Sequence, residues 1–232
     1  KLNSKRDSLV YDPRFPASKY LHQLPELSEP RSYTLIRPES YRNWSECLAV
    51  NKYLKLLPGD YTGWGQIKTA VSGTEADPAI IRHADTSEVS AYQLRGSTKE
   101  AVVEGMKLEG VSNIIITGIT IRGKGDSKNG VIGGMKSSIT NCKNVFIDFC
   151  NFENVTVSGV RMVNVTGCII QNCVFQQFDR ALNGDGGAVA IQASRDRTSS
   201  ANRFVNNEII NFNDGMGFPR EGNPTGSESD LV

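Results

Sequence analysis

The chain has no long apolar run, and neither sign of charge dominates its composition. A membrane-spanning helix needs about 20 mostly apolar residues, and no stretch of these 232 residues approaches that length. The 26 Lys and Arg are matched by 25 Asp and Glu, so the net charge is +1. A dedicated nucleic-acid binder needs an excess of basic residues to neutralise phosphates. We therefore expect neither a membrane span nor a nucleic-acid partner.

Histidine is scarce, and the cysteines follow no metal-binding spacing. The two histidines, His22 and His83, lie far in sequence from the four cysteines between residues 142 and 173. No C-x-x-C and no close Cys/His pair occurs, which excludes a zinc module. The fifth residue, Cys47, makes the count odd and argues against a fully paired disulfide framework. No histidine is placed to activate a thiol, so the cysteines are expected to be small core residues.

The first 57 residues divide into an arm and a helix. No signal peptide is visible, because the polar start is not followed by an apolar segment. Five prolines favour an extended arm over residues 1–38. Apolar residues at helical spacing predict a helix over 39–57, which Pro58 and Gly59 end. From residue 60 onward the pattern is strands and turns without alternating helices, which excludes a doubly wound α/β fold.

An internal repeat dominates the rest of the chain. Residues 112–123, 143–154, 166–177 and 201–212 align, with starts 31, 23 and 35 residues apart. Such spacings fit the coils of a parallel β-solenoid, in which like residues stack about 4.8 Å apart. One predicted column holds Ile116, Ile147, Ile170 and Val205, and another holds Ile121, Phe152, Phe175 and Ile210. Three further sets are predicted to share columns: Cys150 with Cys173; Cys168 with Ile114 and Val145; and Asn172 with Asn207.

A third strand is predicted after each long loop. Residues 130–133, 159–162, 187–190 and 215–218 align on their first glycine, which places the variable loops in one corner. These features predict an all-β fold, a single right-handed parallel β-helix over 39–218 with an N-terminal capping helix. Adjacent coils also leave room for a disulfide by Cα spacing alone. Residues 219–232 are expected to be a loop or tail, with further coils or a partner chain capping the end.

Three segments carry a family resemblance. Residues 56–61 (LLPGDY), 72–82 (SGTEADPAIIR) and 108–122 resemble the entry coils of pectin-lyase-like β-helix proteins, closest in pattern to the chondroitinase B and alginate lyase group. The resemblance covers about residues 45–215, and its motifs are architectural. It implies a secreted, periplasmic or cell-surface protein and an acidic polysaccharide partner. It also implies β-elimination, with a basic residue abstracting the proton and Ca²⁺ or Arg neutralising the uronate.

The exposed face of the third strand, walled by the variable loops, is the natural groove. Its predicted outward residues are Ile132, Arg161 and Val189. Arg161 is a candidate clamp for a sugar carboxylate, or else the partner of a wall carboxylate. Lys136 is the candidate proton abstractor, or else a solvated turn lysine. The loops add candidate substrate-binding residues: Lys124, Lys128, Asp179, Arg180 and Arg195.

Calcium is a candidate cofactor. Asp185, in the run Asn183 to Gly187, and Asp214, in Asn213-Asp214-Gly215, supply the oxygen ligands that Ca²⁺ prefers. Turn formation explains both runs equally well, because Asn, Asp and Gly favour left-handed conformations.

The proposed activity is therefore a polysaccharide lyase acting on a uronate-containing glycan. Two alternatives stay open. The first is a non-catalytic glycan-binding or tailspike-like surface module. The second is a glycoside hydrolase, which the absence of Gly-Asp-Asp and Gly-His-Gly motifs disfavours.

Overall fold

The computed structural model describes residues 32–84, 91–122, 137–153, 159–176, 187–192, 199–210 and 214–217, the backbone alone for 187–192 and 214–217. Almost all of this part of the chain is β-structure in three parallel sheets. Sheet A holds β1 (Thr34–Ile36), β2 (Tyr53–Leu56), β5 (Ala79–His83), β8 (Ser112–Thr117), β11 (Lys143–Asp148), β14 (Ile169–Gln171) and β17 (Arg203–Val205). Sheet B holds β3 (Gly59–Asp60), β6 (Ala101–Val103), β9 (Thr120–Arg122), β12 (Asn151–Glu153), β15 (Val174–Gln176) and β18 (Glu208–Ile210). Sheet C holds β4 (Ile67–Thr69), β7 (Met106–Glu109), β10 (Ser137–Thr140), β13 (Val160–Val163), β16 (Gly187–Gln192) and β19 (Asp214–Gly217).

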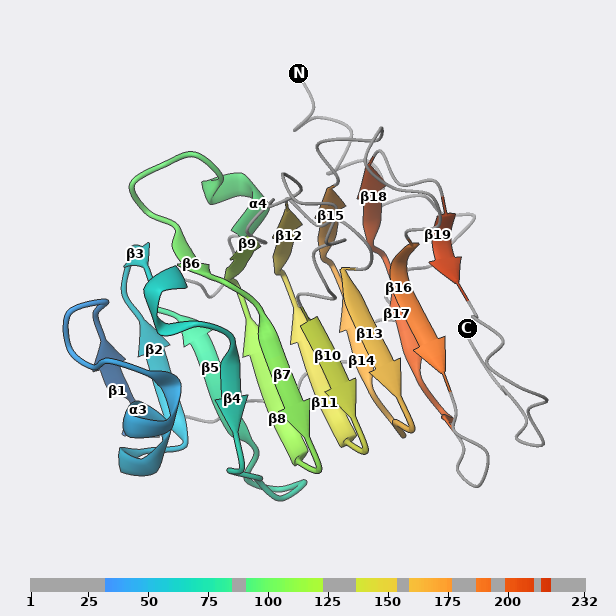
Figure 1. Cartoon of the computed structure of the whole chain (residues 1–232), viewed down its shortest axis with the longest axis horizontal. Helices are drawn as coiled ribbons and strands as arrows, with labels where there is room; N and C mark the ends of the chain where they lie inside the picture. Colours follow the sequence, from blue (N-terminus) through green and yellow to red (C-terminus); the bar gives the residue numbers. More distant parts are fainter. Residues whose placement is uncertain are drawn as a thin grey trace, which may run out of the picture.

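From β2 onward the chain visits sheets A, B and C in the same order, again and again. Each strand pairs in parallel with the equivalent strand of the next coil, as for β8 with β11 and β11 with β14. Figure 1 shows the coils following one another from β1 at one end to β19 at the other. The result is a solenoid-like β fold, compatible with the predicted parallel β-helix.

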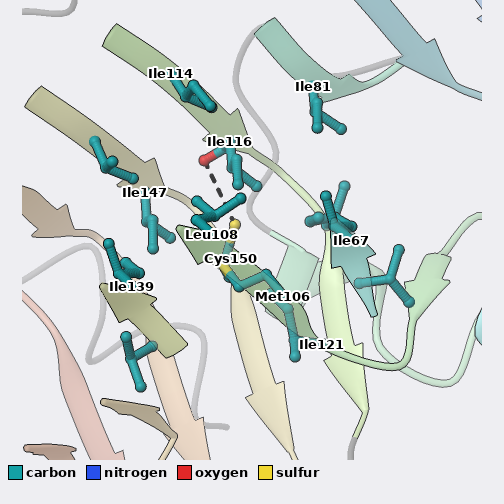
Figure 2. Close-up of a cluster of buried hydrophobic side chains, with 14 of the residues drawn as sticks. Ile67, Ile81, Met106, Leu108, Ile114, Ile116, Ile121, Ile139, Ile147 and Cys150 are labelled. Carbon is teal, nitrogen blue, oxygen red and sulfur yellow. Dashed lines mark hydrogen bonds between the residues drawn. The ribbon is translucent and has the colours of Figure 1, made fainter. Parts of the chain in front are cut away.

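The core is made of stacked columns inside the coils. Ile116, Ile147 and Ile170 are register partners in sheet A, and all three are buried. In sheet B the rings of Phe152 and Phe175 stack with centroids 4.4 Å apart. Figure 2 shows apolar side chains from all three sheets turned toward this common interior. These two predicted columns are confirmed as far as Ile170 and Phe175.

The last coil is shifted by one residue from the predicted alignment. Ile170 pairs with Phe204 instead of Val205, and Phe175 pairs with Ile209 instead of Ile210. A shift of one residue exchanges the two faces of a strand. The observed register packs the ring of Phe204 5.6 Å from that of Phe175, so the larger apolar side chain faces the core.

The same shift changes the amide column. Asn206, not Asn207, stands beside Asn172, and its Nδ2 donates a hydrogen bond to Asn172 Oδ1 at 2.7 Å. Asn207 instead caps backbone groups: its Nδ2 donates to the Ile170 carbonyl, and its Oδ1 accepts from the Cys173 amide.

Sheet C also differs from its predicted register. The strand that pairs with β13 is β10, so Ser138 stands beside Arg161 where Ile132 was predicted. Residues 130–133 lie outside the described residues. On the other side Arg161 pairs with Ala190, while Val189 pairs with the buried Val160. The shared glycines misplace β16 by one residue, because a glycine near the start of a strand does not fix its register.

The observed helix is shorter than the predicted one, which covered residues 39–57. The helix α3 (Trp44–Val50) begins after Asn43, whose side chain accepts a hydrogen bond from the Glu46 amide at 3.0 Å. It ends at Asn51, whose backbone is extended. Residues 53–56 alternate between buried and half-buried positions and form β2. β1, from the predicted arm, pairs with β2.

Aromatic residues pack where α3 meets the first coil. The Trp44 and Trp64 rings lie 5.0 Å apart, and Tyr61, which is fully buried, contacts both. The Tyr61 hydroxyl donates to the Ile36 carbonyl at 2.7 Å. Tyr61 is therefore part of the core, and the half-buried Trp64 packs against it.

All five cysteines are free and buried. The register of β12 and β15 puts Cys150 and Cys173 at matching positions in adjacent coils. The Cys150 thiol donates to the Ile116 carbonyl at 3.7 Å (Figure 2). Burial raises the pKa of Cys47 to about 11 and that of Cys168 to about 12. A thiolate is thus disfavoured at these positions, which fits small core residues.

No helix in the described ranges is both long and apolar enough to cross a membrane.

Candidate functional site

The outer face of sheet C carries a line of basic side chains. In β4, β7, β10 and β13 buried residues alternate with residues that face outward, as the two-residue period of a strand requires. One outward position continues through four coils in exact register, and we call these residues the basic row: Lys68, Lys107, Ser138 and Arg161.

The geometry of the basic row follows from strand spacing. Neighbouring positions stand about 4.8 Å apart, so the row extends about 14 Å from Lys68 to Arg161. Lys68 and Lys107 are exposed, whereas Ser138 and Arg161 are half-buried. Neither lysine forms an ion pair with another described residue. Two like charges directly opposite each other on neighbouring strands repel, so Lys68 and Lys107 gain from an anion placed between them.

A second outward line runs beside the basic row. It consists of Glu109, Thr140 and Val163, which are register partners in β7, β10 and β13. Glu109 is exposed and is the only acidic residue among the outward side chains of these three strands and β4. Three basic residues against one acidic residue give this face a local charge of +2, although the whole chain has a net charge of +1.

Arg161 is the one predicted site residue whose side chain the structure describes. It lies in β13 and points outward, as predicted. Asp214 is the first residue of β19 and pairs with Gly187, but its side chain is outside the described part. The other predicted residues lie outside the described ranges: Lys124, Lys128, Lys136, Asp179, Arg180, Asp185 and Arg195.

Sequence reasoning missed Lys68 and Lys107. The recognisable sequence repeat begins at residue 112, so it does not include the strands of the first two coils. The signal was present, because Ile67-Lys68-Thr69 and Met106-Lys107-Leu108-Glu109 alternate as half-buried strands do. Among the described residues, no group of three or more His, Cys, Asp or Glu side chains is placed to hold a metal ion.

The outer face of sheet B carries a different kind of charged group. We call it the charged cluster, and its members are Arg95, Glu100, Arg122 and Glu153. Arg95 Nε donates to Glu153 at 3.1 Å, and Arg122 Nη2 donates to Glu100 at 3.3 Å. Arg122 Nε also donates to Glu153. The two positive and two negative charges sum to zero.

The carboxylates of the cluster are buried, whereas its guanidinium groups are partly exposed to solvent. The side chains of Glu153 and Glu100 are 3% and 7% exposed, against 33% for Arg95 and 39% for Arg122. Burial alone would lower the pKa of Arg122, but its hydrogen bond and charge interactions with Glu153 and Glu100 raise it overall. The cluster therefore satisfies its own charges and has no need of a ligand for that purpose.

A pocket of about 420 Å³ lies on the outer face of sheet A. Its floor includes the register partners Ile115, Phe146 and Ile169. Along one side, Asn144 Nδ2 donates to Asn113 Oδ1 at 3.0 Å. The remaining lining residues are Thr74, Glu75, Pro78, Gly167, Ala201 and Arg203. The mixture of an apolar floor and both signs of charge does not select one class of ligand.

The chain matches no family model, no curated protein and no solved structure.

Proposed function

We propose that this chain binds an acidic, uronate-containing polysaccharide along the basic row and cleaves it there by β-elimination. The observation that carries the proposal is the register of Lys68, Lys107 and Arg161, which places three basic side chains on one exposed face. The row crosses the strands, so an extended polymer lying along it contacts several coils at once.

The residue types suit carboxylates. The guanidinium of Arg161 can donate two parallel hydrogen bonds to one carboxylate, which fixes its orientation as well as its position. The lysine ammonium groups act as point charges that tolerate different spacings. Ser138, between Lys107 and Arg161, supplies a neutral hydroxyl that pairs with sugar hydroxyls or ring oxygens.

β-Elimination requires a base and a group that stabilises negative charge on the carboxylate. A base removes the proton from the carbon next to the carboxyl group, and the electron pair then forms a C=C bond. The C–O bond to the leaving sugar breaks, and that oxygen takes up a proton. Arg161 favours the first step by stabilising negative charge that develops on the carboxylate. Lys136, which directly precedes β10 in the sequence, is the proposed base, and it lies outside the described residues.

A non-catalytic glycan-binding module is the second candidate. It is favoured by the basic row itself, because binding requires only this row and no base. The two candidates differ in one observable, since only the lyase releases products that carry a C=C bond. The proposed location, secreted, periplasmic or cell-surface, is the same for both.

The experiment incubates the protein with polygalacturonate, alginate and chondroitin sulfates and follows the ultraviolet absorbance of unsaturated products. A neutral glucan is the substrate control, and a chelator arm tests the proposed Ca²⁺ site at Asp185 and Asp214. Arg161→Ala is expected to abolish product formation. Lys143→Gln is the matched control, because Lys143 is an exposed lysine on sheet A. Binding without product on any acidic glycan supports the second candidate, and an absence of binding rejects both.

The finer fold assignment belongs to the same proposal. We propose that the coils wind right-handed, as in pectin-lyase-like proteins, and that α3 caps the first coil. The cap is supported by the contact of α3 with β4 and by the burial of Trp44, Cys47 and Leu48. An experimental structure tests the handedness directly. Leu48→Asp tests the cap, since loss of a cap is expected to lower the melting temperature and expose the Trp44 indole to fluorescence quenchers.

A further inference from the structure

The outer face of sheet A carries a line of apolar side chains. One outward position continues through five coils in exact register, and we call these residues the apolar stripe: Tyr53, Ile80, Ile115, Phe146 and Ile169. The last three of them form part of the floor of the pocket on sheet A. The apolar stripe thus differs from the basic row of sheet C, whose outward residues are all polar.

The isoleucines of the apolar stripe are buried although they face away from the core. Ile80 and Ile115 are 0% exposed and Ile169 is 6% exposed. None of the three belongs to the hydrophobic cluster inside the coils. Outward side chains on a bare sheet face stay partly exposed, and parallel sheets usually have both faces covered. The apolar stripe therefore belongs to a contact within the protein rather than to a bare surface.

The N-terminal arm joins the described structure beside one end of this stripe. Residues 1–31 lie outside the described residues. At the junction, the Ser32 carbonyl accepts a hydrogen bond from Asn51 Nδ2 at 2.7 Å, and the Tyr33 ring lies 6.0 Å from that of Tyr53. The Tyr33 hydroxyl is buried and has no hydrogen-bond partner within the described structure. A polar group of the arm can pair with this hydroxyl if the arm continues over the same face.

The part of the arm nearest β1 has an apolar residue at every third position: Leu21, Leu24, Leu27 and Pro30. Pro25 opposes a helix in this segment. A polyproline II helix has three residues per turn and rises about 3.1 Å per residue, so these side chains share one face, about 9.3 Å apart. Two coils of the protein span about 9.6 Å. The three leucines therefore extend about 19 Å, the same length as the five coils of the apolar stripe.

Charges beside the apolar stripe also complement the arm. Lys55 and Arg82 are half-buried register partners of the same sign. Lys55 is two residues from Tyr53, so it faces the same side of the sheet. The arm carries Glu26 and Glu29, which recur with the same three-residue period on a second face. Two carboxylates placed beside these two cations would relieve the repulsion between them.

We propose that residues 21–30 lie across the outer face of sheet A as a polyproline II segment, with their three leucines on the apolar stripe and their two glutamates beside Lys55 and Arg82. The segment occupies the pocket on sheet A, where its leucines meet the apolar floor and its backbone meets the amides of Asn113 and Asn144. This surface is on sheet A, apart from the basic row of sheet C, so the inference does not depend on glycan binding.

Photo-cross-linking of the full chain tests where the segment lies. Leu24 is replaced with photoreactive benzoylphenylalanine, and cross-linked peptides are identified by mass spectrometry. Cross-links to β8 and β11 are expected. The same probe at Gln23, which lies on another face of the segment, is the matched control and is expected to give a lower yield of these cross-links. Cross-links confined to sheets B and C, or a product of doubled mass that joins two copies of the chain, would overturn the proposal.

Trypsin cleavage after Arg31, which directly follows the segment, tests whether the leucines hold it. Leu24→Asp/Leu27→Asp is expected to speed this cleavage at least about tenfold, because release of a docked segment exposes it to the protease. Gln23→Asp/Ser28→Asp is the matched control, since it adds the same charge at polar positions of the same segment. Its cleavage rate is expected to stay within about threefold of wild type. Equal rates in the two double variants would contradict a segment held by its leucines.

Discussion

The outer faces of sheets B and C both carry charged residues, but the residues on sheet B are paired and partly buried, whereas those on sheet C have an excess of positive charge. On sheet B, Glu100 and Glu153 are buried and each is paired with an arginine. On sheet C, Lys68 and Lys107 are exposed, in register, and of the same sign. A balanced buried cluster stabilises or positions a segment, whereas an unbalanced exposed row creates a field that attracts an opposite charge.

Charges that are not balanced by neighbours are better candidates for ligand binding than charges paired within the protein. Chain-wide composition suggests no polyanion partner, because opposite charges nearly cancel. Sorted by position, they cancel within the charged cluster of sheet B and leave a local excess of +2 on the outward positions of β4, β7, β10 and β13. The following predictions test this contrast, starting with the largest expected effect.

The largest loss of stability is expected when Arg122, the central arginine of the charged cluster, is replaced. Arg122→Met leaves the buried Glu153 and Glu100 with one positive partner fewer, and removing a donor from a buried acceptor costs about 1–3 kcal/mol. Urea unfolding is expected to show this loss of stability. Arg203→Met, at an exposed arginine of β17, serves as control and is expected to change stability by less than about 0.5 kcal/mol. Equal effects of the two variants would show that the charged cluster contributes no more to stability than one exposed arginine does.

Arg161 is expected to behave in the reverse manner. Arg161→Gln removes a bidentate donor, so affinity for an acidic glycan falls at least about tenfold, which corresponds to 1.4 kcal/mol. Its unfolding free energy is expected to fall by less than that of Arg122→Met, because Arg161 occupies an outward, half-buried position on its strand. Calorimetric titration with oligogalacturonate measures the first quantity, and urea unfolding measures the second. A large stability loss without a change in affinity would place Arg161 with the structural charges of sheet B.

Removal of a lysine from the basic row is expected to stabilise the protein slightly. Lys107→Gln ends the repulsion between Lys68 and Lys107, which contributes about 0.2–1 kcal/mol. Because both side chains are exposed, the gain is expected to disappear in about 1 M salt, where the Debye length is about 3 Å. Melting temperatures at low and high salt check this. A destabilised variant at low salt would contradict the assignment of an unbalanced row.

Asp148 provides the smallest and most specific test, because it is a buried carboxylate that is partnered by amides. Its two oxygens accept from Asn172 Nδ2 at 2.8 Å and from Gln171 Nε2 at 3.3 Å. Burial raises its pKa above the ordinary value of 3.8, although these hydrogen bonds oppose the shift. Its stabilising contribution is therefore complete below the unfolded-state pKa and is lost as pH rises through the higher native pKa.

Asp148→Asn is expected to flatten this part of the pH dependence. Unfolding free energies measured from below pH 3.8 to neutrality give the comparison. A variant that keeps the wild-type slope would show that another group produces it.

Much of the fold could be predicted from the sequence. The predictions that failed concern strand register and contacts between residues far apart in the chain. The columns of Ile116, Ile147 and Ile170 were predictable because a core position accepts few residue types. The register of β16 and β17 was not, because small or polar residues such as Gly187 and Ala201 align equally well one residue away. The charged cluster was also missed, since Arg95 and Glu153 are 58 residues apart and only the fold brings them together.

Of the candidate site, Arg161 could be predicted because a single arginine interrupts an apolar strand. Lys68 and Lys107 required knowledge of which strands pair, which the repeat alignment did not cover. The boundary of the β-helix at residue 218 stays a prediction, as do the roles of the loop residues.

The length of the loop at the corner between sheets B and C can vary without changing the pairing of the strands. Only residues 104 and 105 join β6 to β7, whereas residues 123–136 join β9 to β10, and the flanking strands keep their parallel partners in both cases. Hydrogen bonding between coils is thus independent of how much chain this corner holds. A peptide tag or a foreign recognition loop inserted there is expected to alter what the molecule meets without altering how it folds, which makes the corner a suitable place to graft new specificity.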